Sequence, residues 1–159
     1  MKVGVSRILY PLPPSPRPHM KDDPLLRLCG YLLRRASSAA VAALNRRLAP
    51  LKLRHADVAL LMLIDSCPGM TQSQAGRVLD IKRANMVAFV ARLEARGLIR
   101  RRRVDGRSQA LDLTGGGRML LKRARRVVDA HEAALLRGVP EALRPQVLPV
   151  LKALWRAQP

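Results

Sequence analysis

The chain has 159 residues and a formal net charge of +19, from 30 Lys+Arg against 11 Asp+Glu. With 48% hydrophobic residues it can build a core, which excludes wholesale disorder, and it has no run of about 18 apolar residues that could span a membrane. The positive charge predicts a polyanionic partner, most simply nucleic acid. Two cysteines are too few for a disulfide-stapled secreted scaffold, so we expect a cytoplasmic protein.

Aromatic content and charge distribution narrow the kind of nucleic acid. Aromatic residues make up only 3% of the chain, too few for a clustered platform on which single-stranded bases could stack. Residues 81–110 contain nine Lys+Arg and two acidic residues, whereas residues 51–80 contain three of each. We therefore expect double-stranded DNA as the partner and residues 81–110 as the binding region.

The N-terminal segment differs from the rest. Residues 11–19 contain five prolines in nine positions, which favours extended, solvated backbone, so residues 1–23 are expected to be a disordered Pro-rich tail. An alternative is that translation starts at Met20 and that residues 1–19 are not part of the native protein.

Helical patterns begin at residue 24. Apolar residues recur at three- and four-residue spacing through residues 24–50, which predicts one long helix. A second helix is expected over 55–67, and a short third helix should begin after Thr71, with Gln74 completing a capping box. Residues 80–82 form a tight connection to a fourth helix over 83–96, which Gly97 closes.

After Gly97 the pattern of apolar and polar residues changes from that of helices to that of strands. Residues 98–104 and 109–113 flank an Asp-Gly turn, which predicts a β-hairpin. Thr114 then opens another long helix, although the triple glycine at 115–117 suggests either a flexible junction or a late helix start. A last helix is expected over 140–157, bent at Pro149.

Two short helices joined by a tight turn and followed by a basic hairpin form a winged helix-turn-helix. The chain resembles the MarR family of transcriptional regulators over residues 24–157. The motifs that carry the resemblance are LCGYLLRRA from Leu28, TQSQAGRVL from Thr71, ANMVAFVARLEARGLI from Ala84, VDGRSQALDLT from Val104, and Gly117. The fold class expected is mainly α with a small β-hairpin wing, with a winged helix-turn-helix lobe over residues 51–113.

The resemblance implies a homodimer that binds a pseudo-palindromic operator, with the helices of residues 24–50 and 114–159 forming the dimer interface. It implies a ligand-responsive repressor, with a small aromatic or carboxylate effector bound between these helices and the DNA-binding lobe. The residues that could line such a cleft are Tyr31, Arg35, His55 and Met62. Taken alone, a residue of each of these types is more often a core or surface residue with no ligand.

The residues expected to bind DNA lie on three elements. Arg83 and Asn85, in the first turn of the recognition helix, can form bidentate hydrogen bonds with guanine and adenine. The full set is Lys82, Arg83, Ala84, Asn85 and Ala88 in the recognition helix, Thr71, Gln72 and Ser73 before it, and Arg101, Arg103, Asp105, Arg107 and Ser108 in the wing. The resemblance implies that Arg107 enters the minor groove with Asp105 holding its guanidinium.

The chain departs from the family pattern in the recognition helix. Lys82 replaces the capping Ser found in many members, and Val87 and Ala88 replace a Ser/Thr-Arg pair. Base readout is therefore expected to depend on Arg83 and Asn85. In the hairpin, strand side chains alternate faces, so either Arg101 with Arg103 or Arg100 with Arg102 would contact DNA together.

Other functions have less support. Cys29 follows a Leu near the start of the first helix, as in peroxide-sensing members of the family, so a redox-sensing repressor is an alternative, as is a non-specific architectural DNA-binding protein. Free cysteine is more often a small buried hydrophobe. The three histidines are far apart, so no metal site is expected, and no motif suggests an enzyme or a cofactor.

Overall fold

The computed structural model describes residues 23–103 and 109–157. The chain divides into two compact units, Met1–Ala36 and Ser37–Pro159. In the first unit, the 3₁₀ turn η1 (Pro24–Arg27) precedes the start of α1 (Cys29–Leu48). Asp23 caps η1 by accepting a 3.0 Å hydrogen bond from the amide of Leu25. The prediction of a single helix from residue 24 is wrong, because Leu28 has extended backbone angles that separate η1 from α1.

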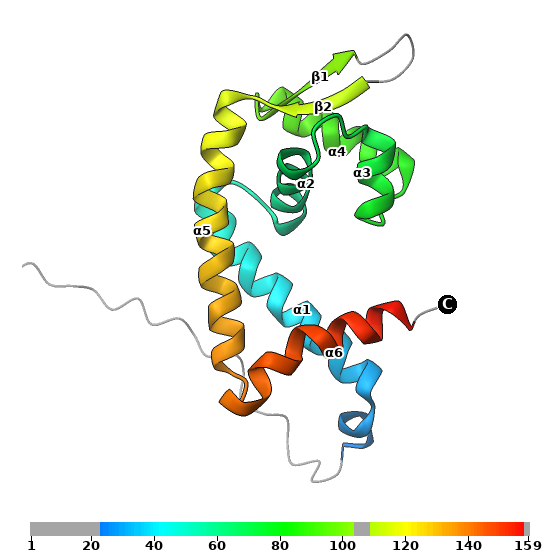
Figure 1. Cartoon of the computed structure of the whole chain (residues 1–159), viewed down its shortest axis with the longest axis vertical. Coiled ribbons are helices and arrows are strands. Elements are labelled where there is room, and N and C mark those ends of the chain that lie inside the picture. Colours follow the sequence, from blue (N-terminus) through cyan, green and yellow to red (C-terminus); the bar gives the residue numbers. More distant parts are fainter. Residues whose placement is uncertain (1–22, 104–108, 158–159) are drawn as a thin grey trace, which may run out of the picture. The chain divides into compact units, whose positions relative to one another are not determined.

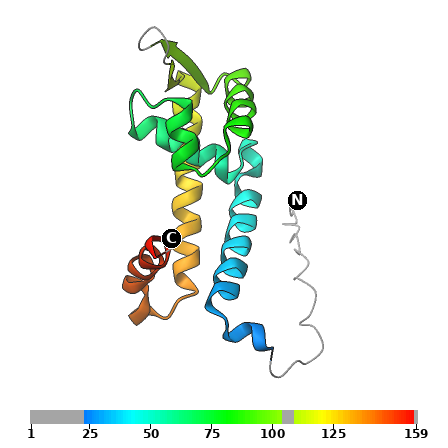
Figure 2. The ribbon, with the colours of Figure 1, turned by 90° about the vertical axis from the view of Figure 1, so that its right-hand side faces the viewer.

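The second unit contains the remainder of α1 and all later elements (Figure 1). They are η2 (Ala49–Leu51), α2 (His55–Ser66), α3 (Gln72–Val78), α4 (Arg83–Ala95), β1 (Ile99–Arg103), β2 (Gln109–Leu113), α5 (Gly115–Arg137), η3 (Glu141–Leu143) and α6 (Arg144–Arg156). The two strands pair antiparallel, with Arg101 opposite Leu111. This confirms the expected mainly helical fold with a β-hairpin. Both views place the hairpin at one end of α5 and α6 at the other (Figures 1 and 2).

The core of the second unit lies where α2, α4, α5 and the hairpin meet. Leu60 and Leu61 of α2 are fully buried, as are Val90 and Leu93 of α4. The hairpin contributes Ile99, Leu111 and Leu113, and α5 contributes Leu121 and Ala124. Because each element has one buried face, the helices α3 and α4 are held against a common scaffold and leave their other faces in solvent.

The hairpin is tied to α5 at its base. The hydroxyl of Thr114 caps α5 by accepting from the amide of Gly117 at 2.9 Å, and it donates to the carbonyl of Gly97 at 2.6 Å. A Cβ at Gly117 would lie 1.9 Å from the carbonyl oxygen of Leu98, so only glycine fits there. The helix begins directly at Gly115. The expectation of a late helix start is therefore wrong, and the glycine at 117 serves close packing.

The C-terminal helix has an uncovered apolar surface. α6 buries none of its residues, and its large exposed apolar residues are Leu148, Val150, Leu151 and Trp155. Pro149 lies inside this helix. No helix among the described residues is long and apolar enough to cross a membrane.

Candidate nucleic-acid interface

The turn between α3 and α4 brings the two helices into close contact. Asp80 has a φ of 51°, and the amide of Ile81 donates to the carbonyl of Gly76 at 2.9 Å. A Cβ at Gly76 would be 3.3 Å from the carbonyl oxygen of Ile81 and 3.5 Å from Cγ of Met86. The absence of a side chain at Gly76 thus lets α4 pack directly on α3, as a helix-turn-helix requires.

The start of α3 has the predicted capping box. The hydroxyl of Thr71 accepts from the amide of Gln74 at 3.3 Å, and the side chain of Gln74 accepts from the amide of Thr71 at 2.8 Å. The Thr71 hydroxyl also lies 2.9 Å from Oε1 of Gln74. Thr71 therefore has a structural role as a cap, whereas Ser73 is exposed and Gln72 is partly exposed.

The start of α4 presents the predicted reading residues to solvent. Lys82, Arg83, Ala84 and Asn85 are all exposed, as is Ala88 one turn later. The opposite face of α4 is buried through Met86, Val90 and Leu93. The helix therefore has a fixed orientation, with its N-terminal side chains free to reach a ligand.

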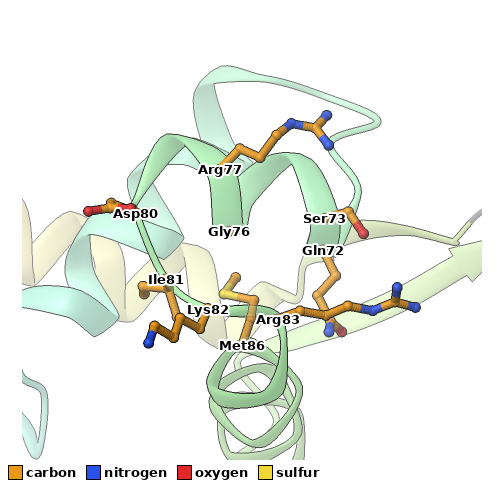
Figure 3. A pocket seen from close by; sticks show the side chains of 9 residues that line it. All are labelled: Gln72, Ser73, Gly76, Arg77, Asp80, Ile81, Lys82, Arg83 and Met86. Atoms are coloured by element: carbon orange, nitrogen blue, oxygen red, sulfur yellow. The ribbon is translucent and has the colours of Figure 1, made fainter. Parts of the chain in front are cut away.

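A hollow of about 410 Å³ lies between α3 and α4. Three cationic side chains line it, from Arg77, Lys82 and Arg83, together with the carboxylate of Asp80. Figure 3 shows Arg83 extending toward the first turn of α3, where Gln72 and Ser73 lie, while Lys82 points the opposite way. The helix-turn-helix thus forms a basic, concave surface suited to an anionic ligand.

The four arginines of β1 differ in their ion pairs. Arg102 donates from Nε to Asp112 at 2.8 Å, and Arg100 lies 4.0 Å from the same carboxylate. On the other face of the strand, Arg101 pairs with Glu94 of α4 at 3.2 Å. Within the described ranges Arg103 has no ion pair. Of the predicted pair Arg101 and Arg103, only the first is thus engaged in an ion pair among the described residues.

The position of α4 is also fixed by a buried carboxylate. Asp57 is 1% exposed; one of its oxygens accepts from Arg92 of α4 at 2.5 Å and the other accepts from the amide of Arg54 at 2.7 Å. The guanidinium of Arg92 also lies 5.2 Å from the centre of the Phe89 ring. Asp57 therefore caps α2 and anchors the recognition helix at the same time.

Of the four residues expected in an effector cleft, His55 and Met62 lie on α2 and line different hollows. His55 lies in a hollow of about 510 Å³ beside Lys52, Arg54 and Arg92, while Met62 lines a different, more apolar one of about 400 Å³. Tyr31 and Arg35 belong to the first unit, where the Tyr31 ring is contacted by Arg34 at 5.4 Å. The shared cleft stays a prediction.

The remaining predictions concern a redox cysteine, the wing, the N-terminal tail and a metal site. Cys29 is a free, exposed cysteine at the first position of α1, and its redox role stays a prediction. Asp105, Arg107 and Ser108 lie outside the described residues, as do residues 1–22 of the expected tail. In the part of the chain that the structure describes, no three His, Cys, Asp or Glu residues could hold a metal ion.

Several residues that form or support this surface were not predicted from the sequence. Gln109 of β2 lines a hollow of about 560 Å³ with Gln72, Arg83 and Val87, so the hairpin and both helices share one concave surface. Asp57 is at the third position of α2, where an acidic residue is a local signal for a cap. The pairing of Glu94 with Arg101 has no comparable sequence signal, because it depends on how the strand packs on α4.

Comparisons with known proteins identify what this arrangement is similar to. A sequence model of the MarR family matches residues 51–108. The HTH-type transcriptional repressor Rv2887 of Mycobacterium tuberculosis (strain ATCC 25618 / H37Rv) is 32% identical over 117 residues, which cover 72% of this chain and 81% of that protein. A solved structure of Rv2887 in complex with salicylic acid has a TM-score of 0.66 at 28% identity, covering 80% of this chain and 96% of that one.

Structures of a second repressor are also similar. The transcriptional repressor CouR bound to a 23-mer DNA duplex has a TM-score of 0.80 at 35% identity, covering 86% of this chain and 98% of that one. CouR bound to p-coumaroyl-CoA has a TM-score of 0.79 at 34% identity, covering 89% of this chain and all of that one (100%).

Proposed function

This chain belongs to the MarR family of transcriptional regulators, and we propose that it is a homodimeric repressor that binds a pseudo-palindromic site in double-stranded DNA and is released by an anionic aromatic effector. The observation that carries the proposal is the shared surface of α3, α4 and β2. There Arg83, Gln72 and Gln109 line one hollow on the exposed side of a helix-turn-helix. Such a helix reads base edges in the major groove from its first turns.

The exposure and the ion pairs of the side chains indicate which part of the DNA each one contacts. Arg83 and Asn85 are exposed at the N-terminal turn of α4 and carry the hydrogen-bond donors that read guanine and adenine. Arg103 is exposed on the hairpin and binds phosphate, whereas Arg102 is neutralised by Asp112. CouR, whose structure is similar to this chain, is bound to a DNA duplex in one of its solved structures. Arg107 and Asp105, which lie between the two strands in the sequence, are the residues we propose for the minor-groove contact.

A second copy of the chain covers the apolar surface of the terminal helices. α6 has no buried residue, and Trp155 and Leu148 are 78% and 59% exposed. Contiguous apolar surface of this kind typically marks a protein–protein interface. Residues 24–50 and 114–159 supply the dimer contacts, and two-fold symmetry then sets the two recognition helices about 34 Å apart, one turn of DNA.

The effector is an aromatic carboxylate or its coenzyme A thioester. Similar proteins are bound to salicylic acid and to p-coumaroyl-CoA in their solved structures. In this chain Lys52 and Arg54 line the hollow around His55, and their cationic side chains suit a carboxylate or a phosphate, while Arg92 in the same hollow is already paired with Asp57. An effector that binds the DNA-incompetent state more tightly shifts the population away from DNA.

Random-site selection on duplex DNA, followed by fluorescence anisotropy, tests the proposal. We expect a two-fold symmetric site, and Arg83→Ala should relax base preference while Arg103→Ala weakens binding to all sequences. Salicylate or p-coumaroyl-CoA should release the selected duplex. Binding without sequence preference would instead indicate an architectural DNA-binding protein, and identical effects of both substitutions would show that α4 is not the reading helix.

A further inference from the structure

One large apolar side chain on α4, that of Val87, is exposed and lies outside the core. Val87 is 49% exposed, whereas the apolar residues on the buried face of the same helix, such as Met86 and Val90, are at most 1% exposed. Because about half of its side chain stays in water, Val87 contributes little to the stability of the fold. The residues around Val87 therefore indicate its role.

The surroundings of Val87 are polar. It lines the hollow of about 560 Å³ between α3, α4 and β2, and it is the apolar residue among the eight that line it. The others are Thr71, Gln72, Ser73, Gln74, Arg77, Arg83 and Gln109. On this surface hydrogen-bond donors can contact base edges and phosphates, while the isopropyl group of Val87 can only make apolar contacts.

Building on the proposed DNA-binding function, we infer that Val87 is a specificity-determining residue that selects thymine. Among the groups that base pairs present in the major groove, the C5-methyl of thymine is the apolar one. An isopropyl group packed on this methyl removes apolar surface from water, whereas at cytosine, which lacks the methyl, the contact is lost. Val87 thus adds apolar readout to the hydrogen-bond readout of Arg83.

The spacing on the helix limits where this thymine lies. Val87 follows Arg83 by four residues, so both are on one side of α4 and about 6 Å apart along its axis. Successive bases rise about 3.4 Å. The thymine therefore lies within about two base pairs of the base contacted by Arg83, and symmetry repeats it in each half-site.

The test removes the methyl from the DNA and the isopropyl group from the protein. With the full chain and the duplex obtained by random-site selection, each thymine is replaced in turn by deoxyuridine, which keeps the base pairing and lacks only the methyl group. Binding of wild type, Val87→Ala and Val78→Ala is measured by fluorescence anisotropy. Val78 is a matched control, because it is also an exposed valine, at 60%, but lies outside the hollow.

For wild type, deoxyuridine at one position per half-site should weaken binding about fourfold, the effect of losing one buried methyl-sized contact. Val87→Ala removes the contact from both half-sites of the homodimer, so it should bind the thymine duplex about sixteenfold more weakly and should not respond to the replacement, while Val78→Ala should behave as wild type. Equal sensitivity in Val87→Ala and wild type, or no sensitive thymine near the Arg83 contact, overturns the inference and leaves the proposed function standing. Failure to select any site overturns the proposed function itself.

Discussion

Gly117→Ala tests the connection between α5 and the hairpin. The new Cβ would lie 1.9 Å from the carbonyl oxygen of Leu98 and 3.0 Å from its carbonyl carbon. Both are backbone atoms, so no side-chain rotation can relieve the overlap. The same oxygen accepts from the amide of Thr114 at 3.1 Å and shares with the nearer carbonyl of Gly97 the proton of the Thr114 hydroxyl, which lies 3.2 Å away. Either Leu98 moves and these bonds weaken, or the start of α5 shifts.

The expected loss of stability in Gly117→Ala combines three effects. Overpacking a close contact costs about 1–3 kcal/mol, and each weakened hydrogen bond costs about 1 kcal/mol. Replacing glycine by alanine in a helix returns up to about 1 kcal/mol. We expect the free energy of unfolding to fall by about 2–4 kcal/mol, which lowers the Tm by roughly 5–15 °C for a chain of this size.

Thermal denaturation followed by circular dichroism measures the effect, with all variants at one protein concentration because a dimer's Tm depends on it. Gly115→Ala is the matched control, since a Cβ at Gly115 has nothing within 4 Å. It should keep or slightly raise the Tm. If Gly117→Ala melts together with Gly115→Ala, the steric argument for the glycine is refuted.

Three further predictions concern single side chains. Thr71→Ala should lower the free energy of unfolding by about 1 kcal/mol in chemical denaturation, because it removes the cap of α3, while Thr71→Ser should keep most of it; equal stability of the two variants would contradict the cap. Asp57→Ala should cost about 2–4 kcal/mol by the same measurement, because it removes the cap of α2 and the charge-assisted hydrogen bond to Arg92; a loss below about 1 kcal/mol would show that α4 is held by its apolar face alone. Arg103→Ala should reduce the slope of log affinity against log salt by about one unit, whereas Arg102→Ala should change it less, because Asp112 already neutralises Arg102; equal slopes for the two variants would contradict this assignment.

Local signals in the sequence predicted much of this fold. The capping box of Thr71 and Gln74 is present as expected, and Gly97 adopts a φ of 66° at the end of α4. These features were predictable because a cap or a left-handed residue depends only on neighbours within one turn. The spacing of apolar residues along α4 likewise predicts which face of the helix is buried and which is exposed.

Contacts between distant residues could not be predicted. Strand alternation shows that Arg101 and Arg103 share a face, but the packing of the hairpin on α4 decides that Glu94 engages Arg101. The role of Gly117 likewise depends on the carbonyl of Leu98, nineteen positions earlier in the chain. Nor does the sequence indicate that His55 and Met62, which both lie on α2, line different hollows.

The pairing of the small sheet has a consequence for solubility. The amide of Leu111 donates to the carbonyl of Met70 at 2.8 Å, so the segment before α3 already occupies the outer edge of β2. The opposite edge belongs to β1, which carries four consecutive arginines, Arg100–Arg103. Unpaired edges invite strands from other molecules, and charge on an edge is one way in which proteins prevent this. The arginines of β1 therefore protect the hairpin against edge-to-edge aggregation, whether or not each of them binds DNA.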